Sequence, residues 1–214
     1  MDEDISIINT QTKNQKIKDF LIQFKKQIIS LFVIILIIVF SYFIYVDFQK
    51  KNKIKIADKY NQAAIDYHSG NKANTKKDLI EIIKEKDKTY SPLSLYFLLD
   101  NKIITENNEI NELFDTIINE INLEKEIKNL VIYKKALFNS EFQTENNLIK
   151  ILNPIMNSES IWKPHALYLM AEYFYYKNEK QKSKEFFQKI IILEKNNLSI
   201  KKEAQRRLNR DFSE

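Results

Sequence analysis

The chain of 214 residues contains no cysteine, one glycine and three prolines. Without cysteine it can form neither disulfides nor thiolate zinc sites nor iron–sulfur clusters, and it lacks a cysteine nucleophile and the cysteine of a lipoprotein anchor. A single glycine cannot build a phosphate-cradling loop. So few glycines and prolines also leave little to punctuate β-hairpins, and runs of Asn, Ser, Lys and Glu fill the connections instead.

Residues that commonly carry chemistry are also sparse. The only two histidines, His68 and His165, lie far apart without ligand spacing around them, so we interpret both as helix-surface residues. Neither HExxH nor GxSxG occurs, and acidic groups such as Asp78, Glu81 and Glu85 fall at the spacing of solvated pairs on a helix. The sequence therefore predicts no catalytic residue, metal, cofactor or small-molecule substrate. An enzyme that uses one carboxylate pair is kept as an alternative.

The charge is high but mixed. The chain has 34 Lys and Arg residues against 29 Asp and Glu residues, a net charge of +5. Basic charge favours anionic partners, yet these residues are dispersed and form no basic helix stripe or stacking platform. We therefore expect no nucleic-acid partner.

Residues 27–46 read QIISLFVIILIIVFSYFIYV, a run of 20 residues without a charge. At about 1.5 Å per residue, such a helix spans the hydrocarbon layer of roughly 30 Å. A secretory signal has a shorter apolar region and ends at a small-residue cleavage site, whereas this run ends in Tyr42, Phe43, Tyr45 and Phe48, a composition typical of an interfacial aromatic belt. A buried core helix is the alternative, but little else in the chain is apolar enough to surround it.

These observations divide the chain into three parts. We expect a short tail over residues 1–26, a transmembrane helix over 27–48 and a folded domain over 49–214. The tail ends in an amphipathic helix that carries Ile17, Phe20, Leu21 and Phe24 on one face. Five lysines precede the span and five follow it, so the positive-inside rule does not decide the orientation.

The folded part contains an internal repeat. WKPHALYLM at 162–170 has a faded copy 72 residues earlier, YSPLSLYFL at 90–98, with proline at the same place in each. Proline at the first turn of a helix is favourable because its missing N–H needs no partner there. Both copies therefore predict the start of a helix. We interpret the aromatic residues Trp162 and Tyr90 as staples that pack at these helix entries.

The same period organises the whole domain into helix hairpins. Apolar residues at spacings of three and four predict pairs about 36 residues apart: 56–68 with 76–83, 92–104 with 109–121, 126–138 with 145–156, and 164–176 with 180–193. Residues 198–208 add a terminal helix. Gly70 aligns with Asn178, at a position that favours a left-handed helix exit.

A helix–turn–helix period of 34–36 residues is the mark of a tetratricopeptide array. Residues 166–197 resemble one tetratricopeptide repeat along their full length, with the small residues Ala171 and Ser183 and the aromatic residues Phe174 and Phe187 at matching positions. Lys195 stands where the repeat has its final proline. We therefore expect an all-α fold, a transmembrane helix followed by a tetratricopeptide-like solenoid of about four repeats with a C-terminal capping helix.

The layout resembles the YfgM-like family of ancillary Sec-translocon subunits. This resemblance implies a bacterial inner-membrane protein with a periplasmic repeat domain, whose partners are the Sec translocon and periplasmic chaperones and which handles newly exported proteins. A scaffold for an envelope or division complex is the alternative within the same class.

A candidate partner-binding groove follows from the period. In a tetratricopeptide repeat, one frame of the first helix faces the concave surface, and tyrosine recurs at this frame, with Ile132 in the remaining rung. The candidate groove residues are Tyr60, Tyr67, Tyr96, Asp100, Ile103, Tyr168, Glu172 and Tyr175. Tyrosine offers apolar area and one hydrogen bond at modest entropic cost. The alternative is that these tyrosines pack between neighbouring repeats.

The last helix carries Arg206, Arg207 and Arg210. Positive charge near a helix C-terminus interacts favourably with the helix dipole. Contact of these arginines with a partner is a further hypothesis.

Overall fold

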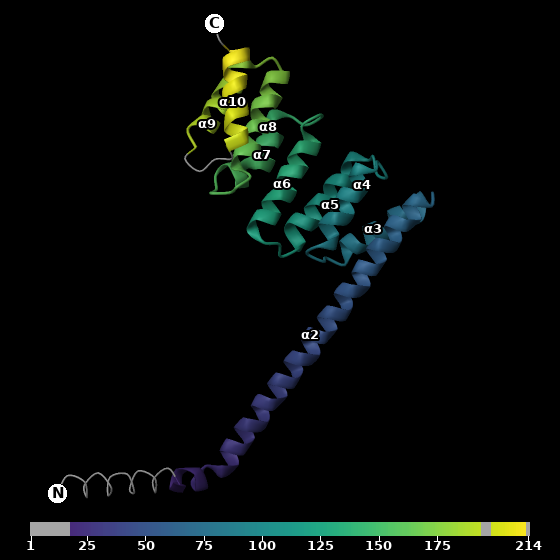
Figure 1. Cartoon of the computed structure of the whole chain (residues 1–214), viewed down its shortest axis with the longest axis vertical. Coiled ribbons are helices and arrows are strands. Elements are labelled where there is room, and N and C mark those ends of the chain that lie inside the picture. The colour runs from purple at the N-terminus through teal and green to yellow at the C-terminus, as the bar shows by residue number, and fades with distance from the viewer. Residues whose placement is uncertain (1–17, 194–197, 213–214) are drawn as a thin grey trace, which may run out of the picture. The chain divides into compact units, whose positions relative to one another are not determined.

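The computed structural model describes residues 18–193 and 198–212, and every regular element in these ranges is a helix. The helices are α2 (Lys25–His68), α3 (Lys72–Lys84), α4 (Tyr90–Asp100), α5 (Asn107–Glu120), α6 (Lys125–Asn139), α7 (Glu145–Met156), α8 (Lys163–Tyr176), α9 (Lys180–Ile191) and α10 (Leu198–Asp211) (Figure 1). The expectation of an all-α chain is confirmed.

The chain divides into two compact units, one up to Lys55 and one from Ile56 onward. In the first unit, α2 is the one described helix that is long and apolar enough to cross a membrane. The large apolar side chains between Ile29 and Phe48 of this helix are exposed, as a lipid-facing surface requires. Residues 18–23 form a helical segment before it, with the rings of Phe20 and Phe24 4.7 Å apart. Ile17 and the acidic tail lie outside the described residues.

In the second unit, successive helices pack against one another along the chain (Figure 1). Three clusters of buried side chains form the core: one reaches from the end of α2 to α6, the next from α6 to α8, and the last joins α8, α9 and α10. Helix α10 lies against both α8 and α9 and covers the C-terminal end of this core.

The first and last helix pairs of this unit repeat the same contact. Thr75 Oγ1 donates a hydrogen bond to the carbonyl of Ala63 at 3.2 Å, and Ser183 Oγ donates one to the carbonyl of Ala171 at 2.8 Å. All four residues are fully buried. A small residue on the first helix lets the second approach closely, and the hydroxyl satisfies its own hydrogen-bonding need by bonding to that helix. The two contacts lie 108 residues apart, three of the predicted periods.

Three of the hairpin turns also share one C-terminal helix cap. Gly70, Lys102 and Asn178 have φ values of 87°, 50° and 62°. In each turn, the next residue's N–H bonds back to a carbonyl five positions earlier, for example Asn71 to Asp66 at 2.9 Å. This is the Schellman motif, which uses a left-handed residue to satisfy the last carbonyls of the helix. The predicted left-handed exits at Gly70 and Asn178 are confirmed.

The predicted helix over 92–104 is wrong at both ends. Helix α4 begins at Tyr90 and stops at Asp100, and Ile103 lies in the turn that follows. The Asn101 side chain bonds to the carbonyl of Phe97 at 2.9 Å, and the Ile103 N–H bonds to Leu98 at 2.9 Å, so the Schellman turn forms one helical turn early. Ile103 then packs back on the core as the apolar residue that often accompanies this motif. The apolar spacing that predicted a helix through Ile103 therefore arose from burial of this residue in a turn.

Candidate partner-binding surface

The tyrosines of the predicted frame lie on the first helix of each pair. Tyr60 is on α2, Tyr96 on α4 and Tyr168 on α8, and each is half-buried. Each packs on one side against a core cluster, Tyr60 and Tyr96 against the first and Tyr168 against the last. Ile132, which occupies the equivalent position on α6, is buried. The three tyrosines therefore lie at the edge of the core, and each has one packed side and one exposed side.

The two tyrosines of the first pair are covered by α4, the first helix of the next pair. The ring of Tyr60 lies 5.7 Å from that of Tyr90 and 6.2 Å from that of Phe97, both on α4. The ring of Tyr67 meets Phe97 edge-on at 5.4 Å. This arrangement matches the alternative in which frame tyrosines pack between neighbouring repeats.

Tyr96 lines a hollow between the first helices α4 and α6. The hollow has a volume of about 370 Å³, and its walls are mainly apolar: Pro92, Leu93, Tyr96, Leu123, Ile127 and Leu130, with Lys88, Thr89 and Glu124. Leu93 and Ile127 are 41% and 43% exposed. Their side chains are available to a bound apolar group.

The Tyr96 hydroxyl is buried and has no hydrogen-bond partner within the described part of the chain. This burial raises the pKa of Tyr96 to about 12, so the phenol stays neutral and remains a donor at physiological pH. Lys134 Nζ lies 5.0 Å from the centre of the ring. A cation at this distance interacts favourably with the ring face and adds positive charge beside the hollow.

Tyr168 lines a second hollow, of about 250 Å³, between α6, α8 and α10; the other lining residues are Tyr133, His165, Ser199, Ile200 and Glu203. An aromatic group joins α6 to the start of α8 next to it, because Trp162 stacks on Tyr133 at 5.7 Å and lies 4.9 Å from His165. Trp162 thus packs at a helix entry as predicted, and Tyr90 does the same against Tyr60.

The placement of His165 on the helix surface is only partly right. The side chain is half-buried among Trp162 and Tyr133. Burial lowers the pKa of His165, although the carbonyl of Ile161 opposes this shift. The imidazole is therefore neutral near pH 7 and acts as part of an aromatic cluster. His68 is exposed, as expected.

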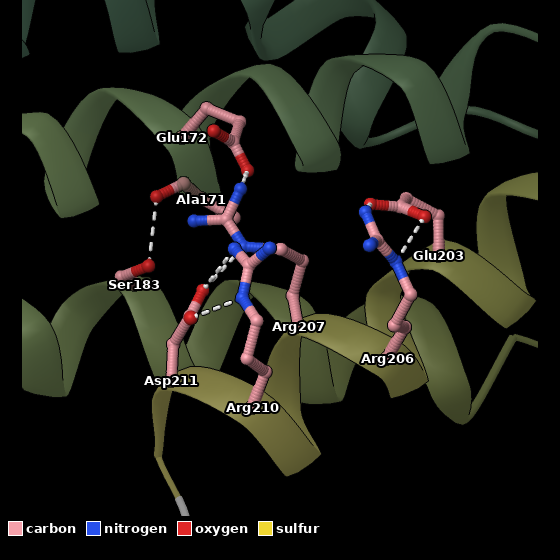
Figure 2. Close-up of polar contacts among 8 residues, drawn as sticks. All are labelled: Ala171, Glu172, Ser183, Glu203, Arg206, Arg207, Arg210 and Asp211. Atoms are coloured by element: carbon pink, nitrogen blue, oxygen red, sulfur yellow. Dashed lines mark hydrogen bonds and ion pairs between the residues drawn. The ribbon is translucent and has the colours of Figure 1, made fainter.

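Glu172 and Tyr175 are held by the last helix. Figure 2 shows the Arg207 side chain reaching from α10 to Glu172 on α8, with Asp211 as a second partner one turn along α10. The guanidinium also lies 4.6 Å from the centre of the Tyr175 ring and 5.3 Å from that of Phe187. Arg207 itself is 7% exposed. Two predicted groove residues thus contact the buried Arg207 and help to attach α10, while the Glu172 side chain stays 37% exposed and lines a hollow of about 500 Å³.

The arginines of α10 consequently differ in role. Arg206 pairs with Glu203, and Arg210 pairs with Asp211 at 2.6 Å; the two arginine side chains are exposed. Arg207 is buried, which the helix-dipole explanation did not anticipate. A sequence signal was present, because Arg207 and Asp211 are four residues apart on one helix.

The structure therefore distributes the eight candidate residues over several places. Tyr96 and Tyr168 line hollows, Tyr60 and Tyr67 meet Phe97, and Glu172 and Tyr175 surround Arg207. Asp100 is exposed at the end of α4, and Ile103 lies in the following turn. Sequence reasoning missed Leu93 and Ile127, since it followed only the tyrosine frame along the helices.

Within the described ranges, no group of three or more His, Asp or Glu side chains could hold a metal ion. Comparison with family models, curated proteins and solved structures finds no match to this chain. The resemblance in layout to translocon subunits is accordingly a hypothesis that rests on the sequence pattern alone.

Proposed function

We propose that the chain is a membrane-anchored interaction protein whose tetratricopeptide-like helix pairs bind segments of other polypeptides. The observation that carries this proposal is the hollow between α4 and α6. It combines apolar walls, two exposed aliphatic side chains and a buried tyrosine hydroxyl that has no partner among the residues the structure describes. Peptide-binding surfaces share this combination of apolar contact area with a few polar anchors.

Two features support the tetratricopeptide-like interpretation of the helix pairs. The Ala63–Thr75 and Ala171–Ser183 contacts are separated by three 36-residue periods. The Gly70 and Asn178 turns, at the same separation, have the same cap. Arrays of such pairs form extended concave surfaces because each repeat adds a small rotation to the last. On this interpretation α4, α6 and α8 line the concave side.

The chemistry of the hollow indicates the kind of segment it accepts. Pro92, Leu93, Ile127 and Leu130 can enclose one apolar side chain. The unpaired Tyr96 hydroxyl can donate to a backbone carbonyl once a small movement exposes it. An unsatisfied buried donor costs free energy, so a ligand that supplies an acceptor gains from it. An unfolded or extended segment with exposed apolar residues meets both requirements.

The apolar helix α2 supports membrane anchoring. By resemblance of layout, we propose that the membrane is a bacterial inner membrane, that the repeat unit is periplasmic, and that the partners are the Sec translocon and periplasmic chaperones. The role is non-enzymatic. An envelope or division complex is the alternative partner, and identification of the bound partner decides between the two.

Site-specific photocrosslinking in native membranes tests the proposal. A photoreactive residue at Leu93 or Ile127 of the full-length protein should capture polypeptide partners. The same residue at Leu137, also on α6 and 46% exposed, is the matched control outside this hollow. Mass spectrometry of the crosslinked species then identifies them.

Translocon subunits or exported proteins enriched at Leu93 and Ile127 would support the full proposal. Components of a division complex would favour the scaffold instead. Equal capture at Leu137, or none at either hollow position, would contradict a binding role for this surface.

A further inference from the structure

The positive charge of the protein is concentrated around its apolar helix. Residues 1–55 carry nine lysines against five Asp and Glu residues, whereas the rest of the chain carries 25 Lys and Arg residues against 24 Asp and Glu residues. The folded unit is thus almost neutral. The basic character of the chain needs an explanation within its first unit.

Four lysines follow the apolar run directly. Lys50, Lys51, Lys53 and Lys55 are exposed on α2, and no acidic residue occupies positions 48–57. Of these four lysines, Lys51 forms an exposed ion pair with Asp47 at 2.7 Å. At 100° per residue these four side chains point around much of the helix circumference, so they form a collar rather than a single stripe.

The position of the collar matches the headgroup layer of a bilayer. Tyr42, Phe43, Tyr45 and Phe48 are exposed at the end of the apolar run, as in an interfacial aromatic belt. With a rise of about 1.5 Å per residue, Lys50 to Lys55 lie within about 14 Å of Val46 along the helix axis. Lysine side chains are long and flexible, so each ammonium group can reach a phosphate from this position.

We propose that Lys50, Lys51, Lys53 and Lys55 form a lipid-binding collar that recruits anionic phospholipids on the membrane face where α2 leaves the bilayer. Juxtamembrane basic clusters attract anionic lipids through the surface potential. The occupant is a membrane headgroup because the collar is adjacent to the aromatic belt. The inference rests on the proposed membrane anchoring.

Lipid selectivity can be measured with the full-length protein in phosphatidylcholine vesicles. Electron paramagnetic resonance with spin-labelled phosphatidylglycerol and spin-labelled phosphatidylcholine gives the immobilised fraction of each. The wild type should prefer the anionic lipid by about twofold or more, and replacing the four collar lysines by Gln should remove much of this preference. The control replaces four exposed lysines of the folded unit, Lys84, Lys150, Lys180 and Lys202, by Gln.

The result would overturn the collar if both quadruple variants keep the wild-type preference, or if both lose it equally. Chloride and phosphate at equal ionic strength should weaken the preference alike, since screening acts on all exposed charges. A stronger effect of phosphate would show a discrete phosphate site and contradict a headgroup collar. Alkaline carbonate extraction separates the two proposals. Release of the protein from the vesicles would contradict membrane anchoring. A protein that stays embedded but shows no lipid selectivity would contradict only the collar.

Discussion

The first and last helix pairs of the folded unit have equivalent residues, yet they are covered in different ways. Tyr67 and Tyr175 lie 108 residues apart, as do Tyr60 and Tyr168. In the first pair, the aromatic ring of Phe97 on α4 covers Tyr60 and Tyr67. In the last pair, the guanidinium of Arg207 on α10, the last helix that the structure describes, covers Tyr175.

The difference shows that α10, the last described helix, is accommodated differently from a helix inside the array. An internal helix buries its far side under the next pair, so an apolar side chain suits it. Helix α10 has charged residues on much of its surface and buries only Ala204 and Arg207. A buried arginine is tolerated there because Glu172 and Asp211 neutralise it and aromatic rings contact its faces. Polar outer faces are typical of capping helices.

The largest expected effect comes from truncating the shared core position. Leu79 and Phe187 are equivalent in the two pairs, and both are fully buried. Phe187→Ala should lower the free energy of unfolding by about 3–5 kcal/mol, and Leu79→Ala by about 2–5 kcal/mol. Phe187 also contacts Tyr168 and Phe212, so its loss loosens α10 as well.

Urea denaturation of the full-length protein in detergent, followed by circular dichroism, measures both variants. Leu137→Ala is the matched control, because this side chain is exposed. A change smaller than about 1 kcal/mol for Phe187→Ala would contradict the packing of the last pair.

The sequence predicted features that depend on residues close together in the chain better than features that depend on distant ones. The starts of α8 and α9, and the turn between them, followed from Pro164, from Asn178 and from helical periodicity, all local signals. The early end of α4 was missed because the Asn101 side-chain bond competes with apolar periodicity that continues through Ile103 and Ile104. Apolar periodicity does not reveal a side-chain hydrogen bond that ends a helix.

The contact between Arg207 and Glu172 could not be predicted from the sequence for a different reason. Glu172 is 35 residues away on another helix, and pairing requires the angle at which α10 packs on α8. The tyrosine frame was predicted on the right helices, but its degree of burial depends on which helix covers it. Periodicity predicts which face of a helix a residue lies on, but it does not predict which other helix packs against that face.

The next effect in size concerns Arg207. Arg207→Ala should lower the free energy of unfolding by about 2–3 kcal/mol, because Asp211 loses a buried partner and two aromatic rings lose their cover. Arg207→Met keeps the packing and removes the charge, so it should cost less than the alanine variant. Thermal melting of both variants compares the two contributions. Equal losses would mean that packing contributes nothing measurable.

This network also predicts an acid dependence. Arg210, and Arg207 behind it, hold the pKa of Asp211 well below its usual range. A carboxyl with a lowered pKa in the folded state stabilises the protein above its unfolded pKa, and this contribution is lost as the pH falls below about 4. Between pH 6 and pH 3 the melting temperature of the wild type should therefore fall more than that of Asp211→Asn. Parallel pH profiles would show that Asp211 does not contribute through its charge.

The smallest effects concern the turns of the same two pairs, where one uses Gly70 and the other Asn178. Gly70 has φ 87° with open space where a Cβ would lie, so Gly70→Ala introduces no clash and meets only the backbone penalty of a left-handed conformation. Gly70→Ala should lower the free energy of unfolding by about 1 kcal/mol.

Asn178→Gly should raise the free energy of unfolding by roughly a few tenths of a kcal/mol, because asparagine already tolerates this conformation. Asn178→Ala is the control and should destabilise about as much as Gly70→Ala. These differences are measurable as shifts in the urea midpoint, and a neutral Gly70→Ala would show that the first turn is not held in the left-handed conformation that makes it equivalent to the last.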